Sequence, residues 1–309
     1  MNPIPRTSAT SRNEAQGVCA VVVAYFPDDG FSGRLRIIAP QVDALVVVDN
    51  TLGQAGAWQT ELTKDRTGRI HLISNRVNLG IAKALNQGLE YALKIDCRWI
   101  LTLDQDSQCH PGMVQALLQT ASSCEDKPVV IGGNYFDAKR GRHEVTVDGT
   151  EDCLERKTVI TSGCMVDATF AQRIGGYRED YFIDQVDHEF CLRVRRHGRR
   201  VVISRKPVMD HSVGGHRGPK VPLLGMMLPD HSALRKYYIT RNSVATVRAF
   251  WTREPAWSLV RMIRLFLGLP AMLLLEKDKS TKARAFAAGL RDGLGNRMGP
   301  CRHPWLTGE

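Results

Sequence analysis

The segment from Trp99 to Ser107 constrains the fold most, because an apolar run of strand length ends there in two carboxylates one residue apart. Such a run, bounded by polar turn residues, is typical of a buried strand, and open α/β sheets bind ligands outside the carboxyl ends of their strands. In extended backbone Asp104 and Asp106 point the same way and can offer oxygen ligands to a divalent cation that also holds phosphate. A strand that simply ends in an Asx-type turn is the alternative interpretation of so short a motif.

Other apolar runs alternate with helical patterns around this segment. Val18 to Tyr25 is nearly all apolar and rich in valine, as in a parallel strand buried on both faces. Strands are also expected over 44–50, 70–73, 129–133, 159–166 and 201–203, with helices over 81–93 and 111–121 and a turn-rich excursion over 134–155. This order predicts an α/β fold with a Rossmann-like, mostly parallel central sheet and helices on both faces.

The ends of the chain differ from the middle in composition. Residues 1–16 are polar, with no apolar segment of the kind found in secretion signals, and we expect a disordered leader. The net charge is +10, and residues 235–309 hold 14 Lys and Arg against 5 Asp and Glu, so most of the charge lies there. The eight cysteines form no Cys-x-x-Cys pair, which predicts reduced thiols in a cytoplasmic protein.

The basic C-terminal region includes an apolar stretch from Trp257 to Leu275 in which Arg261 and Arg264 lie three residues apart. Its charge-free part, Leu265 to Leu275, has 11 residues and contains Pro270, whereas a span of the bilayer needs about 20 apolar residues. We therefore expect a helix that lies in the interface of an anionic membrane. The alternative is a helix that packs on the catalytic domain and exposes its basic face to solvent.

Seven motifs in a fixed order carry a family likeness. They are Ala24-Tyr25-Phe26-Pro27, Val48-Asp49-Asn50, Asn78-Leu79-Gly80-Ile81-Ala82, Leu103-Asp104-Gln105-Asp106, the strand with Gly163, Phe182-Ile183-Asp184 followed by Asp187, Glu189 and Leu192-Arg193, and His211-Ser212 with Gly214. Together they resemble the inverting GT-A glycosyltransferases of family 2. Phe182-Ile183-Asp184 and the stretch from Tyr237 to Asn242 are most similar to bacterial rhamnosyltransferases that use dTDP-L-rhamnose. The likeness covers roughly residues 18 to 300.

The resemblance implies a role for each matching residue. Asp187 would be the general base that deprotonates the acceptor hydroxyl, with Asp184 and Glu189 orienting the acceptor. Tyr25, Asp49, Asn78, Gly80, Asp104 and Arg241 would bind the dTDP-sugar donor, and Asp104, Asp106 and His211 would hold Mg²⁺ or Mn²⁺ on its diphosphate. Simpler alternatives are a surface loop histidine for His211 and a solvated helical charge for Arg241.

The resemblance also implies an organisation and a location. Residues 17–234 would form the GT-A nucleotide-sugar-binding and catalytic domain, and 235–309 a helical region on the membrane surface. The enzyme would work in the cytoplasm, peripheral to the inner face of the bacterial cytoplasmic membrane, on a saccharide or lipid-linked saccharide acceptor of the cell surface, such as O-antigen or lipopolysaccharide. The sequence leaves open whether the chain forms a homo-oligomer.

Three other functions compete with a dTDP-rhamnose transferase. Another nucleotide sugar could be the donor. A sugar-nucleotide nucleotidyltransferase is related in fold, but the chain lacks an early glycine-rich loop with Arg and Lys to grip a triphosphate. A basic nucleic-acid-binding protein would account for the C-terminal charge, but strand-end carboxylates repel phosphate unless they hold metal, so we expect no nucleic-acid partner.

Overall fold

A computed structural model of the chain describes residues 17–53, 56–62, 68–124, 126–138, 141–211, 220–221, 226–227 and 231–307. The leader expected over 1–16 and the residues Ser212 and Gly214 of the last motif lie outside these ranges.

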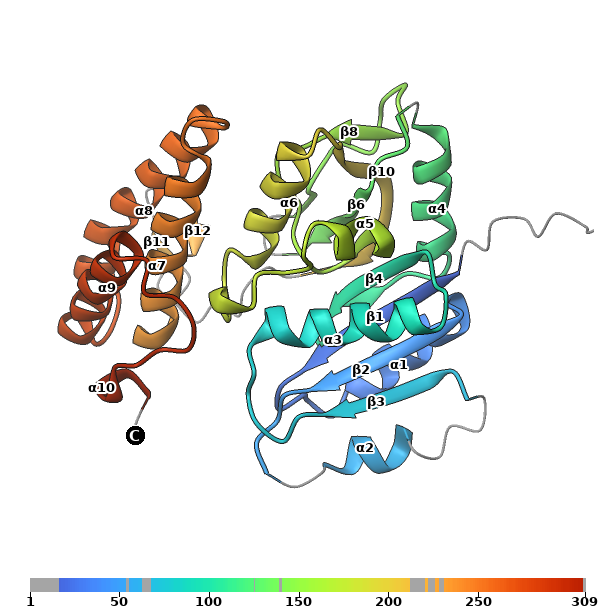
Figure 1. Ribbon diagram of the computed structural model, residues 1–309, viewed down its shortest axis with the longest axis horizontal. Helices are drawn as coiled ribbons and strands as arrows, with labels where there is room; N and C mark the ends of the chain where they lie inside the picture. Colours follow the sequence, from blue (N-terminus) through green and yellow to red (C-terminus); the bar gives the residue numbers. More distant parts are fainter. Residues whose placement is uncertain are drawn as a thin grey trace, which may run out of the picture.

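A ten-stranded sheet forms the centre of the molecule, with the strand order β3-β2-β1-β4-β9-β6-β10-β5 (Figure 1). The strands along this order are β3 (Ile70–Ser74), β2 (Ala44–Asp49), β1 (Val18–Ala24), β4 (Trp99–Asp104), β9 (Cys164–Asp167), β6 (Val130–Asp137), β10 (Val201–Asp210) and β5 (Gln108–Cys109). Off this path, β7 (Arg142–His143) pairs with β6 and β8 (Cys153–Glu155) pairs with β10. A separate pair joins β11 (Lys220–Val221) and β12 (Met226–Met227).

Parallel pairing of β3, β2, β1 and β4, and of β6 with β10, confirms the predicted mostly parallel sheet. The exceptions are β9, which runs antiparallel to both β4 and β6, and the short strands β5, β7 and β8, each antiparallel to its partner. The chain leaves β6 at the carboxyl edge of the sheet, passes through the hairpin strands β7 and β8, and then enters β9 in the reverse direction. The turn at Gly163, whose φ is +73°, immediately precedes that entry.

Helices cover both faces of the sheet, as the alternating pattern predicts. On one face α3 (Ile81–Lys94), α5 (Ala168–Arg173) and α6 (Val186–Arg196) pack against side chains such as Val21 and Val46. On the other face α1 (Phe31–Ile38) and α4 (Met113–Ser123) cover Val22 and Val47. Valine suits these strands because its branched side chain packs well on a pleated surface that is buried on both sides. Short segments α2 (Ala57–Leu62), η1 (Ala39–Gln41) and η2 (Glu179–Tyr181) complete this part.

The last part of the chain forms a group of helices that stands beside α6 (Figure 1). It consists of α7 (Ala233–Phe250), α8 (Pro255–Leu275), α9 (Lys279–Leu294) and the short α10 (Pro304–Thr307). Helix α8 continues through Pro270, and its most apolar 18-residue stretch has a mean hydropathy of 1.8 with 11% of it buried. By length and composition alone it is long and apolar enough to cross a membrane, because the helix extends well beyond the charge-free run that the sequence argument counted.

The prediction of eight reduced thiols was wrong for one pair, because Cys124 and Cys153 form a disulfide. The pair joins the end of α4 to β8, which antiparallel pairing on β10 brings close. A separation of 29 residues concealed the pairing in the sequence. Cys19, Cys97, Cys109, Cys164, Cys191 and Cys301 are free thiols.

Candidate active site

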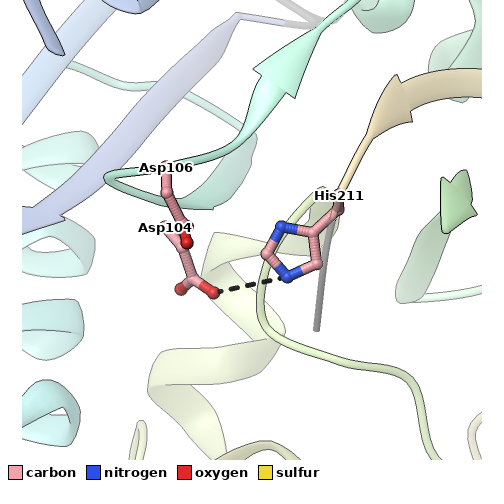
Figure 2. Close-up of side chains that lie close together, drawn as sticks. All are labelled: Asp104, Asp106 and His211. Atoms are coloured by element: carbon pink, nitrogen blue, oxygen red, sulfur yellow. Dashed lines mark ion pairs between the residues drawn. The ribbon is translucent and has the colours of Figure 1, made fainter. Parts of the chain in front are cut away.

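Asp104, Asp106 and His211 come together at the carboxyl edge of the sheet (Figure 2). Asp104 ends β4, Asp106 lies in the turn that follows, and His211 comes directly after β10. One ligand atom from each of the three lies within 4.8 Å of the others, and His211 Nε2 is 3.9 Å from Asp104 Oδ2. Two carboxylates and one imidazole fit a divalent cation such as Mg²⁺ or Mn²⁺ that keeps further positions for water or phosphate.

Electrostatics at this cluster also fit a cation. The pKa of Asp104 is raised to about 7, mainly by burial and also by the negative charges of Asp106 and Asp187, with Arg235 opposing them. Three carboxylates therefore lie close enough to repel one another. A divalent ion bound there would relieve their repulsion.

Polar contacts from neighbouring segments fix the turn that carries the two aspartates. Gln105 Oε1 accepts a hydrogen bond of 2.7 Å from the backbone N–H of Tyr25, and Arg34 Nε donates to the carbonyl of Gln105 at 2.7 Å. The hydroxyls of Ser107 and Ser162 also bond to each other. Gln105, the middle residue of Asp-x-Asp, thus connects the end of β1 to the end of β4. The motif alone did not predict this role, because it depends on a contact between two distant segments.

The residues predicted to bind the donor lie at the same edge. In the register of the sheet, Asp49 lies opposite Ala24 and Asp104 lies opposite Val23, so the ends of β1, β2 and β4 are level. Asp49 is buried and accepts hydrogen bonds from the N–H of Thr51 at 2.9 Å and from the amide of Gln59. Tyr25 has an exposed fraction of 42%.

Asn78 and Gly80 shape the loop that leads into α3. The side chain of Asn78 accepts from the N–H of Gly80 at 3.0 Å, and the side chain of Asn50 donates to the Gly80 carbonyl at 3.1 Å. Gly80 has φ +82°, and a Cβ there would lie 2.6 Å from the carbonyl oxygen of Phe182. Glycine is therefore required on both conformational and steric grounds.

Asp184 and Asp187 approach the metal-site residues from the other side, at the start of α6. Asp187 is close enough for its charge to raise the pKa of Asp104. Asp184 Oδ1 accepts from Arg235 at 3.3 Å, while its Oδ2 is buried with no hydrogen-bond partner among the residues that the structure describes. Burial raises the pKa of Asp184, and Arg235 opposes this.

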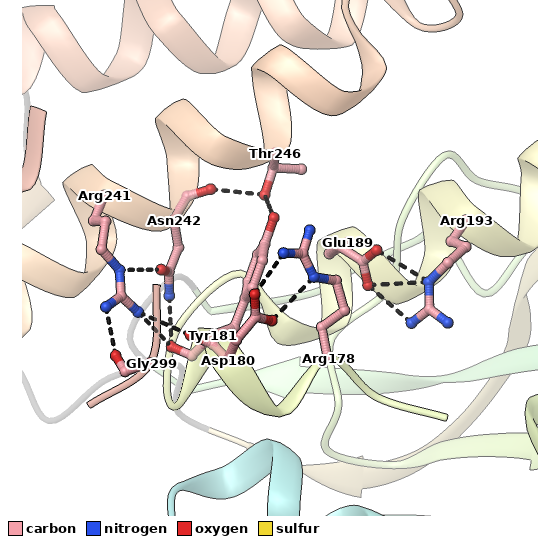
Figure 3. Close-up of polar contacts among 9 residues, drawn as sticks. All are labelled: Arg178, Asp180, Tyr181, Glu189, Arg193, Arg241, Asn242, Thr246 and Gly299. Atoms are coloured by element: carbon pink, nitrogen blue, oxygen red, sulfur yellow. Dashed lines mark hydrogen bonds and ion pairs between the residues drawn. The ribbon is translucent and has the colours of Figure 1, made fainter. Parts of the chain in front are cut away.

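The structure places Glu189 in a buried ion pair within α6, and its contact with the acceptor stays a prediction. Glu189 is 2% exposed and forms an ion pair with Arg193 one helical turn later, with Arg193 Nη2 to Glu189 Oε2 at 2.9 Å (Figure 3). Arg193 also donates to the backbone carbonyls of Ile174 and Gly176, at 2.5 and 2.6 Å. Glu189 therefore anchors α6 to the Gly175-Gly176 turn, and both its oxygens are engaged.

Arg241 is also fully buried, and its contact with the diphosphate stays a prediction. It donates to the side chain of Asn242 and to the backbone carbonyls of Gly299, Asp180 and Tyr181 (Figure 3). The sequence placed Arg241 on an amphipathic helix, and nothing local indicated that segments about 60 residues away would supply the acceptors for both of its Nη atoms. Arg241 fastens the C-terminal helices to the loop before α6.

The basic side of α8 lies near the carboxylates of Asp184 and Asp187. Neither the membrane-surface helix nor the solvent-facing helix that the sequence suggested included this arrangement. Arg261 donates to the hydroxyl of Ser243 through Nε at 3.0 Å and Nη2 at 2.8 Å. Burial lowers the pKa of Arg261, while the charges of Asp187 and Asp184 oppose that change. The ring of Trp257 lies 5.8 Å from that of His188. The three-residue spacing of Arg261 and Arg264 signalled a common face but not its direction.

A Rossmann-like sheet with an Asp-x-Asp turn, a histidine and an opposing carboxylate at its carboxyl edge is the arrangement of a GT-A glycosyltransferase. Residues 38–178 match the family described as Glycosyl transferase family 2. The dTDP-rhamnosyl transferase RfbF of Shigella flexneri is 30% identical over 247 residues, which cover 75% of this chain and 80% of that protein. The chain belongs to glycosyl transferase family 2 and is a glycosyltransferase.

Solved structures support the fold independently of sequence identity. Staphylococcus aureus TarS residues 1–349 in complex with UDP is similar with a TM-score of 0.54 and 13% identity, over 90% of this chain and 72% of that one. GalNAc-T7 with UDP, GalNAc and Mn²⁺ gives a TM-score of 0.56 at 12% identity, over 90% of this chain and 55% of that one. Against a longer TarS chain the match spans 43% of that chain. At these identities the similarity concerns the fold alone.

Proposed function

We propose that this glycosyltransferase transfers L-rhamnose from dTDP-L-rhamnose, with inversion at the anomeric carbon, to a hydroxyl of a saccharide or lipid-linked saccharide. The observation that carries the proposal is the approach of Asp187 to Asp104 and Asp106 at one sheet edge, in a chain 30% identical to a dTDP-rhamnosyl transferase. An inverting transfer needs a base opposite the leaving diphosphate, and this arrangement supplies a carboxylate on each side of the space between them.

In this proposal the donor lies along the ends of β1, β2 and β4. Asp49 and Tyr25 contact the nucleoside, the Asn78–Gly80 loop borders the sugar, and Asp104 and Asp106 hold the metal with His211. A bound Mg²⁺ or Mn²⁺ would take up the negative charge that develops on the departing diphosphate. The side chain of Asp187 accepts the proton of the acceptor hydroxyl, and Asp184, with one buried oxygen unpartnered, orients the acceptor.

Asp187→Asn tests the base, because the amide keeps the size of the side chain and removes the proton acceptor. We expect release of dTDP from dTDP-L-rhamnose to fall by about 10²–10⁴-fold, the usual contribution of a positioned base, with donor affinity unchanged by calorimetry. Asp210→Asn is the matched control, since this exposed carboxylate adjoins His211 and bonds to His110 at 3.1 Å. Normal turnover in Asp187→Asn would refute the assignment, as would loss of donor binding.

A panel of nucleotides tests the donor. A ligand that binds only the folded state stabilises it by about 2.7 kcal/mol at 100 times its Kd, so dTDP-L-rhamnose with Mn²⁺ should raise Tm more than UDP-GlcNAc or UDP-GalNAc. Release of pyrophosphate from dTTP, instead of dTDP from the nucleotide sugar, would identify a nucleotidyltransferase.

We also propose that α8 holds the enzyme on the cytoplasmic face of an anionic membrane. Large apolar side chains along α8 are exposed, namely Leu259, Val260, Ile263, Phe266, Leu267, Leu273, Leu274 and Leu275. An exposed apolar patch on a basic region is suited to a bilayer surface that combines acyl chains with negative headgroups.

Sedimentation with vesicles tests this proposal. Wild-type protein should bind phosphatidylserine-containing vesicles at low salt and be partly released at high salt, which screens charge but leaves apolar insertion. Leu267→Asp and Leu274→Asp, each more than 70% exposed, should weaken binding, whereas Leu52→Asp, at an exposed leucine outside α8, should not. Equal binding by all variants would exclude α8 as the contact.

A further inference from the structure

The loop that leads into α6 has an unusual backbone. Phe182, Asp184 and Gln185 have φ values of 65°, 63° and 64°, in the left-handed region that residues other than glycine rarely adopt. Such a conformation is costly and persists only where the surroundings hold the backbone in place. The loop ends at Val186, where α6 begins, one residue before Asp187. Its conformation therefore sets the position of the proposed base.

Asn242 of α7 is the main group that holds this loop from the C-terminal side. Its Nδ2 lies 2.9 Å from the carbonyl oxygen of Tyr181, 2.7 Å from that of Ile183 and 2.9 Å from that of Asp184. The amide is 0% exposed, and its Oδ1 accepts from Arg241 Nε at 2.9 Å, which fixes the orientation of the amide (Figure 3). The two amide hydrogens of one side chain are thus shared among three carbonyls of a strained segment.

Contacts on the donor side hold the same loop from the opposite direction. The carbonyl of Phe182 accepts from the backbone N–H of Ile81 at 2.7 Å, next to Gly80. The ring of Phe182 stacks on Tyr238 of α7, with ring centroids 5.2 Å apart and an interplanar angle of 15°. The loop before α6 therefore lies between the start of α3 and helix α7. The bond from Ile81 comes from backbone, whereas the bonds from α7 come from side chains, which substitution can remove.

We propose that Asn242 is a positioning residue for the transfer step, acting through the backbone before α6 on Asp184 and Asp187. This inference rests on the proposed function of Asp187. Without the amide, the carbonyls of Ile183 and Asp184 lose this donor, while that of Tyr181 keeps the bonds from Arg241 Nη2 and the N–H of Ile183. The backbone at Asp184 and Gln185 can then relax from its left-handed conformation, which moves the start of α6. A misplacement of about 1 Å costs roughly 10²-fold in rate. The metal-site residues come from the ends of β4 and β10 and the turn after β4, whereas Asn242 lies on α7, so donor binding should persist.

Asn242→Ser and Asn242→Asp test the proposal in the full-length protein. Serine keeps one donor, whereas aspartate keeps the shape but places a carboxylate against three carbonyl oxygens. The readouts are the kcat for dTDP release from dTDP-L-rhamnose with Mn²⁺, the Kd for that donor, and Tm. We expect kcat to fall by about 10²-fold in Asn242→Asp and by less in Asn242→Ser, with donor Kd unchanged.

The matched control is Asn134→Ser on β6. Asn134 is equally buried and also bonds to backbone of other segments, donating to the carbonyls of Val145 at 3.0 Å and of Arg205 in β10 at 2.9 Å. It should lower Tm without a comparable loss of kcat. If Asn242 variants do not fold, Thr246→Val is the second variant. It removes the 3.0 Å hydrogen bond to the Tyr181 hydroxyl and the 2.7 Å bond to the backbone carbonyl of Asn242 but leaves the Asn242 amide in place, so it should give a smaller fall in kcat.

Each outcome distinguishes this inference from the proposed function. A kcat in the Asn242 variants equal to that of Asn134→Ser at matched Tm would overturn the positioning role. A donor Kd that worsens as much as kcat would overturn it too. If Asp187→Asn keeps its turnover, the assignment of Asp187 as the base is refuted. If Asp187→Asn is inactive while the Asn242 variants stay fully active, Asp187 remains the proposed base and only the positioning role of Asn242 is rejected.

Discussion

The Gly80→Ala substitution tests how closely the loop at Asn78–Gly80 packs against Phe182 in the segment before α6. The backbone of Gly80 has φ +82° and ψ 162°, a region occupied almost only by glycine, so alanine should cost of order 1–3 kcal/mol from conformation alone. The added methyl would also lie 2.6 Å from the carbonyl oxygen, 2.7 Å from Cδ2 and 2.9 Å from Cα of Phe182. Overpacking of this kind costs about a further 1–3 kcal/mol, because backbone has to move.

The assay is urea unfolding of Gly80→Ala beside Gly112→Ala. Gly112 has the same φ of +82° with ψ 5°, and a Cβ there meets nothing within 4 Å, so its alanine variant should lose only about 1–2 kcal/mol. Gly80→Ala should also turn over more slowly, since a shift of Phe182 moves the segment before Asp187. Equal stability of the two variants, with unchanged turnover in Gly80→Ala, would refute the close contact on which this reasoning depends.

Three further predictions concern charges. The pKa of Asp104, raised to about 7, lies above the value of about 3.9 in an unfolded chain, so the folded protein keeps a proton that the unfolded chain loses between these values. Without metal, in EDTA, Tm should therefore fall as pH rises through that window, and it should fall less in Asp106→Asn. Mn²⁺ should raise Tm more at the upper end of this pH range. A Tm independent of pH would contradict this prediction. Glu189→Gln breaks a buried ion pair and should cost about 3–5 kcal/mol in urea unfolding while turnover of the folded enzyme persists; loss of turnover at full stability would restore its acceptor role. Arg241→Lys should lower the urea midpoint without changing donor Kd, because an ammonium cannot reach four acceptors that a planar fork spans; a weaker donor Kd would return Arg241 to the diphosphate.

The sheet and the metal-site residues could be predicted from the sequence because their signals are local. Each parallel strand is a short apolar run, and the polar residue at its end must meet those of its neighbours once the sheet forms. Asp104 and Asp106 needed nothing more than that rule. His211 needed the motif order as well, because its strand is separated from β4 by β9 and β6 in the sheet.

The contacts that the sequence did not indicate depend on tertiary packing. Glu189 and Arg193 share one helix, and their i to i+4 spacing was visible, but only tertiary burial shows that the pair is closed to a ligand. Arg241 finds its acceptors about 60 residues away on either side, at Asp180 and Gly299. The reversed direction of β9 follows from the path of the segment between β6 and β9. The hydrophobic pattern of β9 itself does not indicate the direction in which the strand runs.

The contacts of Gly299 bear on the order in which the enzyme is completed during synthesis. The carbonyl of Gly299 accepts from Arg241, and its N–H donates to the carbonyl of Asp180 at 2.6 Å, within the segment that leads to the proposed base. A ribosome makes the sheet, Asp104, Asp106 and His211 long before it reaches residue 299. Domains fold in the order in which they are made, so a nascent chain could already hold a nucleotide sugar while the opposing carboxylate is not yet in place. The order of synthesis would then keep an immature enzyme from consuming its donor.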